Sequence, residues 1–188
     1  MKTRSIQLLC MILALTVCSS LAFAQSEAKK PADDKRAPIV KEIESQWQGA
    51  KKHTLAYIDA MPENAMSFKP TPEVRTFAEQ MLHLAFWNYG LPEFAGGKAN
   101  PYGKKQDVLE KREDMKTKAA LRKVVEESYD NVLAFIATLN EAKLLEVVPT
   151  VKETRLSVLS HALDHQTHHR AQTTIYLRLK GITPPPEQ

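Results

Sequence analysis

Four of the six histidines in this chain of 188 residues lie close together, in the segment His161-Ala-Leu-Asp-His165-Gln-Thr-His168-His169. On a helix, His165 and His169 are one turn apart on the same face, with Cβ atoms about 5–6 Å from each other. Two imidazoles at that separation can share one metal ion. Leucines and other apolar residues beside them turn this face inward, where an imidazole needs a partner. A metal site and a pair of hydrogen-bonded core histidines are both consistent with this pattern.

The other histidines are weaker signals when each is taken alone. His83 shares a predicted helix face with aromatic residues, which favours a hydrogen-bonded core position over a metal ligand. His53 stands beside two lysines, which is typical of a solvated histidine. His161 and His168 lie about 40° and 60° from His165 around the helix. That position favours a rim or surface residue over a supporting contact to a metal ligand.

Apolar residues at three- and four-residue steps predict four long helices. These begin near Pro38, Thr76, Thr117 and Thr150, and they end before Met61, at Gly90, after Leu139 and at Gly181. Thr76 with Glu79, and Thr150 with Glu153, match the capping-box pattern of a helix start, which explains Glu79 as a capping residue. No stretch shows the sustained two-residue alternation of a strand. We therefore expect an all-α protein with a four-helix bundle.

Residues 91–116 connect the second and third predicted helices. Prolines and glycines fill the first half, and a dense charge run from Lys104 to Lys116 fills the second. This composition predicts a long mobile connection with one or two solvated helical turns. Connections of this kind often border binding sites.

The first 24 residues have the features of a cleavable signal peptide. Lys2 and Arg4 precede an apolar run that closes in Ala22-Phe23-Ala24, which predicts cleavage before Gln25. Residues 25–37 are charged and poor in apolar side chains, as in a flexible linker, and residues 38–188 form the domain. These features predict a secreted or periplasmic protein with no membrane anchor after processing.

The composition of the predicted mature chain excludes two classes of function. Both cysteines, Cys10 and Cys18, lie in the predicted signal peptide, so the mature chain has neither a thiol nucleophile nor a thiolate metal ligand. The signal peptide also carries two basic residues and no acidic one, so its removal lowers the formal net charge from +4 to +2. A charge this small does not indicate nucleic-acid binding.

Two motifs considered together resemble the DinB-like family. They are His83-Leu-Ala-Phe-Trp87 and His165-x-x-x-His169-Arg170-Ala171-Gln172, and the resemblance runs from about Pro38 to the C-terminus. It includes the YfiT-type metal-dependent members and the bacterial thiol transferases. The resemblance implies a four-helix bundle with one divalent metal ion, nickel or zinc, bound by His83, His165 and His169. Ala171 stands where the family most often has glycine, at a position predicted to be exposed.

The resemblance implies a metalloprotein whose ion acts as a Lewis acid, in hydrolysis or in thiol transfer to a small-molecule substrate, and the predicted signal peptide makes it an exported one. The alternative is a non-enzymatic bundle that holds a metal or a small ligand, because no carboxylate is clearly placed as a general base. A bundle without metal is a third interpretation. Arg170 is expected to pair with a carboxylate between helices. A homodimer is also expected, because family members often dimerise and residues 94–102 offer an aromatic surface.

Overall fold

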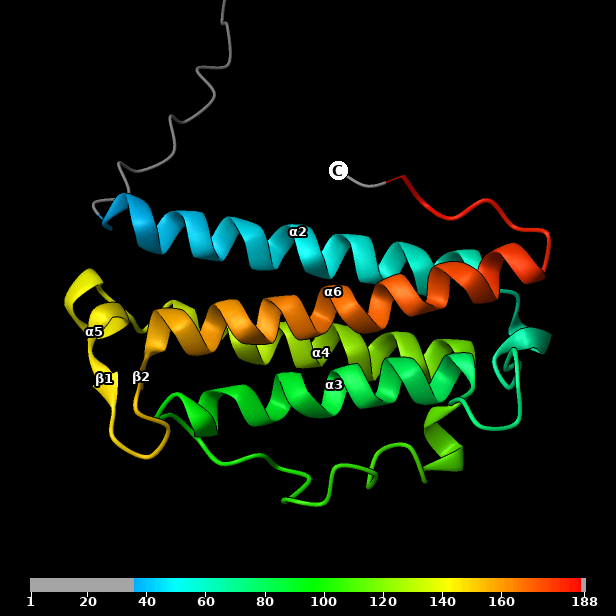
Figure 1. Ribbon diagram of the computed structural model, residues 1–188, viewed down its shortest axis with the longest axis horizontal. Coiled ribbons are helices and arrows are strands. Elements are labelled where there is room, and N and C mark those ends of the chain that lie inside the picture. The colour runs from blue at the N-terminus through cyan, green and yellow to red at the C-terminus, as the bar shows by residue number, and fades with distance from the viewer. Residues whose placement is uncertain (1–35, 187–188) are drawn as a thin grey trace, which may run out of the picture. The chain divides into compact units, whose positions relative to one another are not determined.

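The computed structural model describes residues 36–186, and within them four long helices lie side by side (Figure 1). The long helices are α2 (Pro38–Ala60), α3 (Phe77–Phe94), α4 (Lys118–Ile136) and α6 (Arg155–Leu179). Single 3₁₀ turns at Glu63–Ala65 and Glu113–Met115 lie in the connections before α3 and α4. The predicted helical architecture is confirmed. The predicted signal peptide and most of the predicted linker lie outside the described residues.

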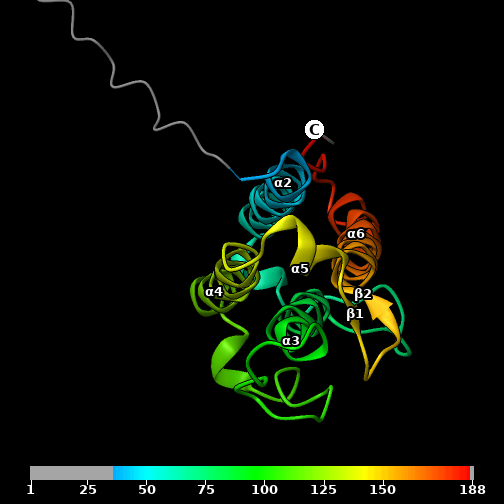
Figure 2. The same cartoon turned by 90° about the vertical axis from the view of Figure 1, so that its left-hand side faces the viewer.

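Each long helix takes one corner of the bundle (Figure 2). Helix α3 packs against α4 and α6, and α2 packs against the same two helices from the opposite corner. Every helix contributes fully buried side chains to one core, including Trp47, Leu82, Tyr129 and Leu177. No helix in the described part of the chain is long and apolar enough to span a membrane. The arrangement places α3 and α6 next to each other, so residues on their facing sides can meet.

Helix α3 begins as predicted but does not end at Gly90. Thr76 accepts a hydrogen bond from the backbone N–H of Glu79, and the Glu79 carboxylate accepts one from the N–H of Thr76. The helix then runs through Gly90 and Pro92 to Phe94. Proline lacks the N–H that would donate to the carbonyl of Asn88. The side-chain amide of Asn131 on α4 donates to that carbonyl at 3.4 Å, so the helix continues and carries one further turn.

The second predicted capping box, Thr150-x-x-Glu153, is wrong. Residues Val147–Val148 (β1) pair antiparallel with Glu153–Thr154 (β2), so Thr150 lies in the turn of a short hairpin. Lys152 closes that turn with a φ of 59°. Helix α6 starts four residues later, where the Thr154 side chain accepts a hydrogen bond from the N–H of Ser157 at 3.1 Å. A five-residue helix before the hairpin, α5 (Glu141–Leu145), was not predicted either.

The far end of α6 matches its prediction. Gly181 has a φ of 74°, which is the left-handed conformation that glycine adopts most readily. Its N–H donates to the carbonyl of Arg178 at 2.9 Å, and the N–H of Ile182 donates to that of Leu177 at 2.9 Å. This pair of bonds is the Schellman motif, which satisfies the last carbonyls of the helix. Helices α2 and α4 also end within three residues of their predicted ends, at Ala60 and Ile136.

Candidate metal centre

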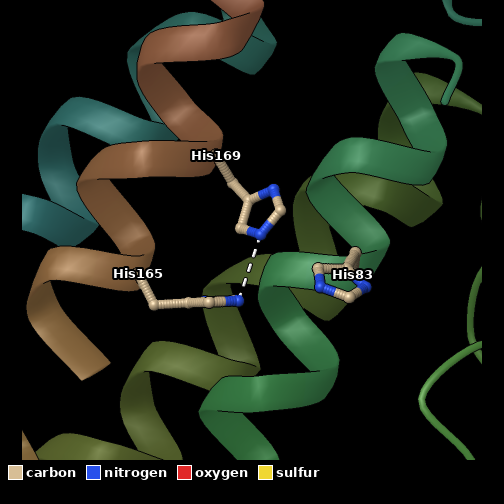
Figure 3. A group of neighbouring side chains, drawn as sticks. All are labelled: His83, His165 and His169. Carbon is tan, nitrogen blue, oxygen red and sulfur yellow. Dashed lines mark hydrogen bonds between the residues drawn. The ribbon is translucent and has the colours of Figure 1, made fainter. Parts of the chain in front are cut away.

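Three histidines from two helices converge between α3 and α6. His83 comes from α3, whereas His165 and His169 come from successive turns of α6 (Figure 3). The ring centroids of His165 and His169 are 4.4 Å apart, and those of His83 and His169 are 4.6 Å apart. One ring nitrogen from each histidine lies within 4.8 Å of the other two. Nitrogens bonded to one zinc ion are at most about 4.2 Å apart, so a small side-chain rotation brings all three into range.

His169 is oriented by an amide relay. Its Nδ1 lies 2.8 Å from Oε1 of Gln80, which can only accept, so Nδ1 carries the proton and the lone pair is on Nε2. The Gln80 amide donates to Oε1 of Gln172 at 2.7 Å. The Gln172 amide in turn donates to Nε2 of His168 at 2.8 Å. His168 also packs edge-on against His169, with ring centroids 5.0 Å apart, but its hydrogen bond goes to Gln172 and not to a ligand ring.

His83 is oriented by a carboxylate. Its Nδ1 donates to Oε1 of Glu110 at 2.7 Å, and the other oxygen of Glu110 accepts from Nε of Arg75 at 2.7 Å. The lone pair of His83 is therefore on Nε2, where it accepts a hydrogen bond from the indole N–H of Trp87 at 3.1 Å. A histidine whose second nitrogen donates to a carboxylate is the usual arrangement of a metal ligand. Trp87 must release Nε2 before an ion can take that lone pair.

His165 is the one of the three histidines whose two ring nitrogens are not both hydrogen-bonded. Its Nδ1 is buried and has no hydrogen-bond partner. Its Nε2 lies 3.0 Å from Nε2 of His169, which already presents a lone pair. Whichever nitrogen of His165 carries the proton, the ring is left with a donor or an acceptor that is not satisfied. A cation between the two Nε2 atoms accepts a lone pair from each ring and leaves the proton of His165 on Nδ1. The residues present thus fit a divalent metal ion.

The electrostatic surroundings keep the two α6 histidines neutral. Burial lowers the pKa of His165 to about 4, with smaller effects from His83, His168 and Arg75. Burial also lowers the pKa of His169 to about 3, with His165 and His83 adding to the effect. Neutral imidazole is the form that binds a metal. Three such ligands leave a fourth position for water or a substrate.

The remaining candidate residues lie outside the cluster. His161 lies near Glu153, with Nδ1 3.2 Å from a carboxylate oxygen, and its side chain is 73% exposed. His53 is on α2, where its ring packs edge-on against Tyr57. Glu79 caps α3 and pairs with Lys116 at 3.0 Å rather than with a ligand imidazole. The predicted carboxylate partner of Arg170 is wrong, because no ion pair joins that side chain to a carboxylate in residues 36–186 and its Nη1 is buried without a hydrogen bond.

Glu110 was missed because its neighbourhood looks like solvated chain. It lies in the charge run of the long connection, where eight of the other residues from Lys104 to Lys116 are basic or acidic, with no helical period. The available signal was the apolar pair Val108-Leu109 in that run, of which Leu109 is fully buried. Leu109 holds the connection against the bundle and places the next residue beside His83. Gln80, which orients His169, was missed because glutamine on a helix face carries no specific signal.

Comparison with known proteins agrees with this fold. The sequence profile of the DinB superfamily matches residues 46–173. No curated protein matches the chain. A solved DinB-like protein from Bacillus cereus ATCC 10987 has a TM-score of 0.65 at 15% identity, over 78% of this chain and 95% of that one. The DinB-like protein YjoA from Bacillus subtilis has a TM-score of 0.62 at 21% identity, over 78% and 98%.

The chain is thus a helical-bundle protein with a three-histidine cluster that could hold a metal ion. It belongs to the DinB superfamily.

Proposed function

We propose that this protein is an exported metalloenzyme that binds one divalent ion, zinc or nickel, through His83, His165 and His169. The observation that supports it best is the state of His165, whose Nδ1 is buried without a partner while its Nε2 faces that of His169 at 3.0 Å. A core histidine kept for packing alone is expected to find hydrogen-bond partners for its ring. The ring of His165 instead has one nitrogen without a partner, and its Nε2 can bond to His169 only by donating to the lone pair that a metal ion would otherwise take.

The bound ion would supply Lewis-acid chemistry, polarising a substrate or lowering the pKa of a bound water or thiol. The chain's own residues set the geometry. Glu110 fixes the tautomer of His83, and Gln80 fixes that of His169, so that both present Nε2 to the same point. The desolvated surroundings of His165 and His169 keep both rings unprotonated well below neutral pH.

Hydrolysis and group transfer both remain compatible with this site. Glu110 is held by both Arg75 and His83, so it orients a ligand and is not free to take a proton from substrate. This favours reactions in which the nucleophile is activated by the ion itself. The alternative function is a non-enzymatic metal-binding or ligand-binding bundle, and it is favoured by the lack of a free carboxylate beside the three rings among the described residues.

Elemental analysis of the purified protein tests the metal site. We expect about one zinc or nickel ion per chain, and a loss of nearly all of it in His83→Ala, His165→Ala and His169→Ala. His168→Ala is the matched control, since His168 packs against His169 and bonds to Gln172 but is not one of the three converging histidines, and it should cost at most about ten- to a hundredfold in affinity. Full metal occupancy in His169→Ala would overturn the assignment.

Turnover separates the enzyme from the binding module. The metal-loaded protein is assayed on esters, amides and pairs of a thiol with an electrophilic acceptor, with the His169→Ala variant as the control. We expect one class to turn over with the loaded wild-type protein and not with the variant. No turnover in any class, with metal bound, would favour the non-enzymatic alternative.

The proposal that the protein is exported depends on the sequence of residues 1–24 alone. The intact mass of the protein recovered from the periplasm or medium should correspond to a chain that starts at Gln25. A mass that retains the first 24 residues would contradict cleavage.

A further inference from the structure

A cavity of about 370 Å³ opens directly beside His165. Three elements line it: the second half of α3, the first half of α6 and the β1–β2 hairpin. The lining residues are Trp87, Leu91, Phe94, Val151, Glu153, Val158, His161, Ala162 and His165. Because His165 belongs both to this wall and to the histidine cluster, a molecule in the cavity reaches the proposed metal site.

The cavity exists because of two features that the sequence did not predict. Helix α3 continues through Pro92, and that extra turn carries Leu91 and Phe94 into the wall. The hairpin before α6 supplies Val151 and Glu153 on the other side. Arg155 fastens the hairpin in place, because it donates to the carbonyl of Ala95 at 2.9 Å and pairs with Glu146 at 2.8 Å.

The walls are apolar and well ordered by ring contacts. The rings of Trp87 and Phe94 stack with centroids 5.8 Å apart and planes inclined by 23°. Trp87 also packs edge-on against His165 at 5.6 Å. Phe94 is 45% exposed although it is a large aromatic residue on a well-formed helix. An exposed aromatic wall that continues a buried ligand cluster is typical of a small-molecule site.

The charges at the rim restrict what can enter. Among the described residues that line the cavity, Glu153 is the single acid and no lysine or arginine is present. Glu153 accepts from Ser157 at 2.6 Å and lies 3.2 Å from Nδ1 of His161. An anionic group placed against the Glu153 side of the cavity would meet a carboxylate and no lysine or arginine, which disfavours it there.

We propose that this cavity binds the apolar part of the substrate, an uncharged aliphatic or aromatic group attached to a polar head that reaches the metal. The volume corresponds to about twelve water molecules in the liquid, so the group has at most about a dozen non-hydrogen atoms. This inference rests on the proposed metal function for the head group. The cavity itself does not depend on that function, and the two can be tested apart.

The probes are two homologous series, studied by titration calorimetry with zinc-loaded protein and with protein treated with EDTA. Acetohydroxamate, butanohydroxamate and hexanohydroxamate carry a metal-binding head, whereas ethanol, butanol and hexanol do not. In both series we expect affinity to rise about fourfold for each added methylene until the cavity is full. Only the hydroxamates should weaken when zinc is removed. The monohydroxamate of adipic acid, which places a carboxylate at the end of the same chain, should bind at least about tenfold more weakly than hexanohydroxamate.

Ala162→Phe fills the cavity without altering a histidine. It should bring the affinity for hexanohydroxamate down to within about fourfold of that for acetohydroxamate. The matched control, Ala119→Phe at an exposed position of α4, should leave both affinities unchanged. Phe94→Ala removes one wall at a half-exposed position and should weaken the hexyl compounds several-fold while sparing acetohydroxamate. Thermal melting confirms that each variant is folded.

The possible results distinguish the cavity proposal from the proposed metal function. Chain-length dependence in both series without any effect of zinc would support the cavity and count against the metal function. An effect of zinc without chain-length dependence would overturn the cavity proposal and leave the metal function standing. Equal affinity for hexanohydroxamate and the adipic monohydroxamate would overturn the proposed preference for uncharged groups.

Discussion

The bundle buries two groups of polar side chains, and they differ in how completely each satisfies its own hydrogen bonds. The first crosses all four long helices and links Thr54, Tyr129, Gln166, Asn88 and Ser128. The second is the histidine cluster between α3 and α6. Both are built from side chains that are costly to bury.

The first group is closed. The hydroxyl of Tyr129 lies 2.7 Å from that of Thr54 and donates to Gln166 at 3.0 Å. Gln166 donates to Asn88, which donates to Ser128 at 3.1 Å, and Ser128 ends the network on the carbonyl of Val125. Burial raises the pKa of Tyr129 to about 12, so its proton stays available for donation. Such a network rigidifies a core, and it has no open hydrogen-bonding position that a ligand could fill.

The histidine cluster satisfies only some of its hydrogen bonds. Glu110 and Gln80 satisfy the outer nitrogens of His83 and His169, but Nδ1 of His165 has no partner and two Nε2 atoms face each other. The contrast shows that burial of polar groups alone does not mark a functional site. The histidine cluster differs because His165 cannot satisfy both of its ring nitrogens with the neighbours it has.

His165→Leu should give the largest difference between the two regions. With zinc at about a thousand times its dissociation constant, the wild-type protein gains about 4 kcal/mol of stability that the variant cannot gain. In EDTA the variant should be as stable as the wild type or more so, because leucine removes a buried nitrogen without a partner. Chemical denaturation with and without zinc measures both. A large loss of stability in EDTA would show that His165 is a satisfied core residue.

Gln166→Leu should show the opposite pattern. Gln166 is 1% exposed and joins Tyr129 to Asn88, so its removal leaves buried polar atoms without partners. We expect a loss of about 3 kcal/mol in the free energy of unfolding, equal with and without zinc. Metal content per chain should not change. A zinc-dependent loss would mean that the network and the cluster are coupled.

Glu110→Gln tests how much the outer contacts matter. The amide can still accept from Nδ1 of His83, but it loses the charge that pairs with Arg75. We expect metal affinity to fall about ten- to a hundredfold in a competition titration with a chromophoric chelator. Glu113→Gln is the control, because that side chain is 81% exposed and pairs only with Lys116. Equal affinities for the two variants would remove Glu110 from the site.

The smallest effect is a dependence on pH in the metal-free protein. The pKa of His165 is about 4 in the folded state against 6.5 as its ordinary value. The unfolded chain therefore binds the proton first, and stability falls as the pH drops from 6.5 towards 4. For a fully buried histidine the free energy of unfolding would fall by about 1.4 kcal/mol for each pH unit. About half of that is expected for this partly buried ring. Denaturation at pH 6 and pH 5 in EDTA should show a shallower slope for His165→Leu than for the wild type.

The helices and the three histidines were predictable because both follow from local rules. Periodicity gave the number and order of the long helices, and one-turn spacing placed His165 beside His169. The inward position of His83 followed from its aromatic neighbours, but its meeting with the other two required the resemblance to a family. A helix face does not by itself specify which other face it meets.

The parts that sequence reasoning missed depend on contacts distant in the chain. Gly90 and Pro92 are stop signals, yet α3 continues because Asn131 on α4 supplies the missing donor. Thr150 has the right pattern for a cap, yet the pairing of Val147–Val148 with Glu153–Thr154 moves the helix start to Thr154. Glu110 reaches His83 only because Leu109 is buried. In each case a tertiary contact decides between two locally acceptable structures.

A metal ion bound by one histidine of α3 and two of α6 would have a further role. His83 and His165 are about 80 residues apart in the sequence, so an ion that joins them closes a loop containing the whole of α4. A cross-link over a loop of that length removes chain entropy from the unfolded state worth about 4–5 kcal/mol in the polymer treatment of disulfides. The predicted mature chain has no cysteine and therefore no disulfide. The ion would act as the corresponding cross-link, and unlike a disulfide it could be removed by a chelator and restored by a new ion.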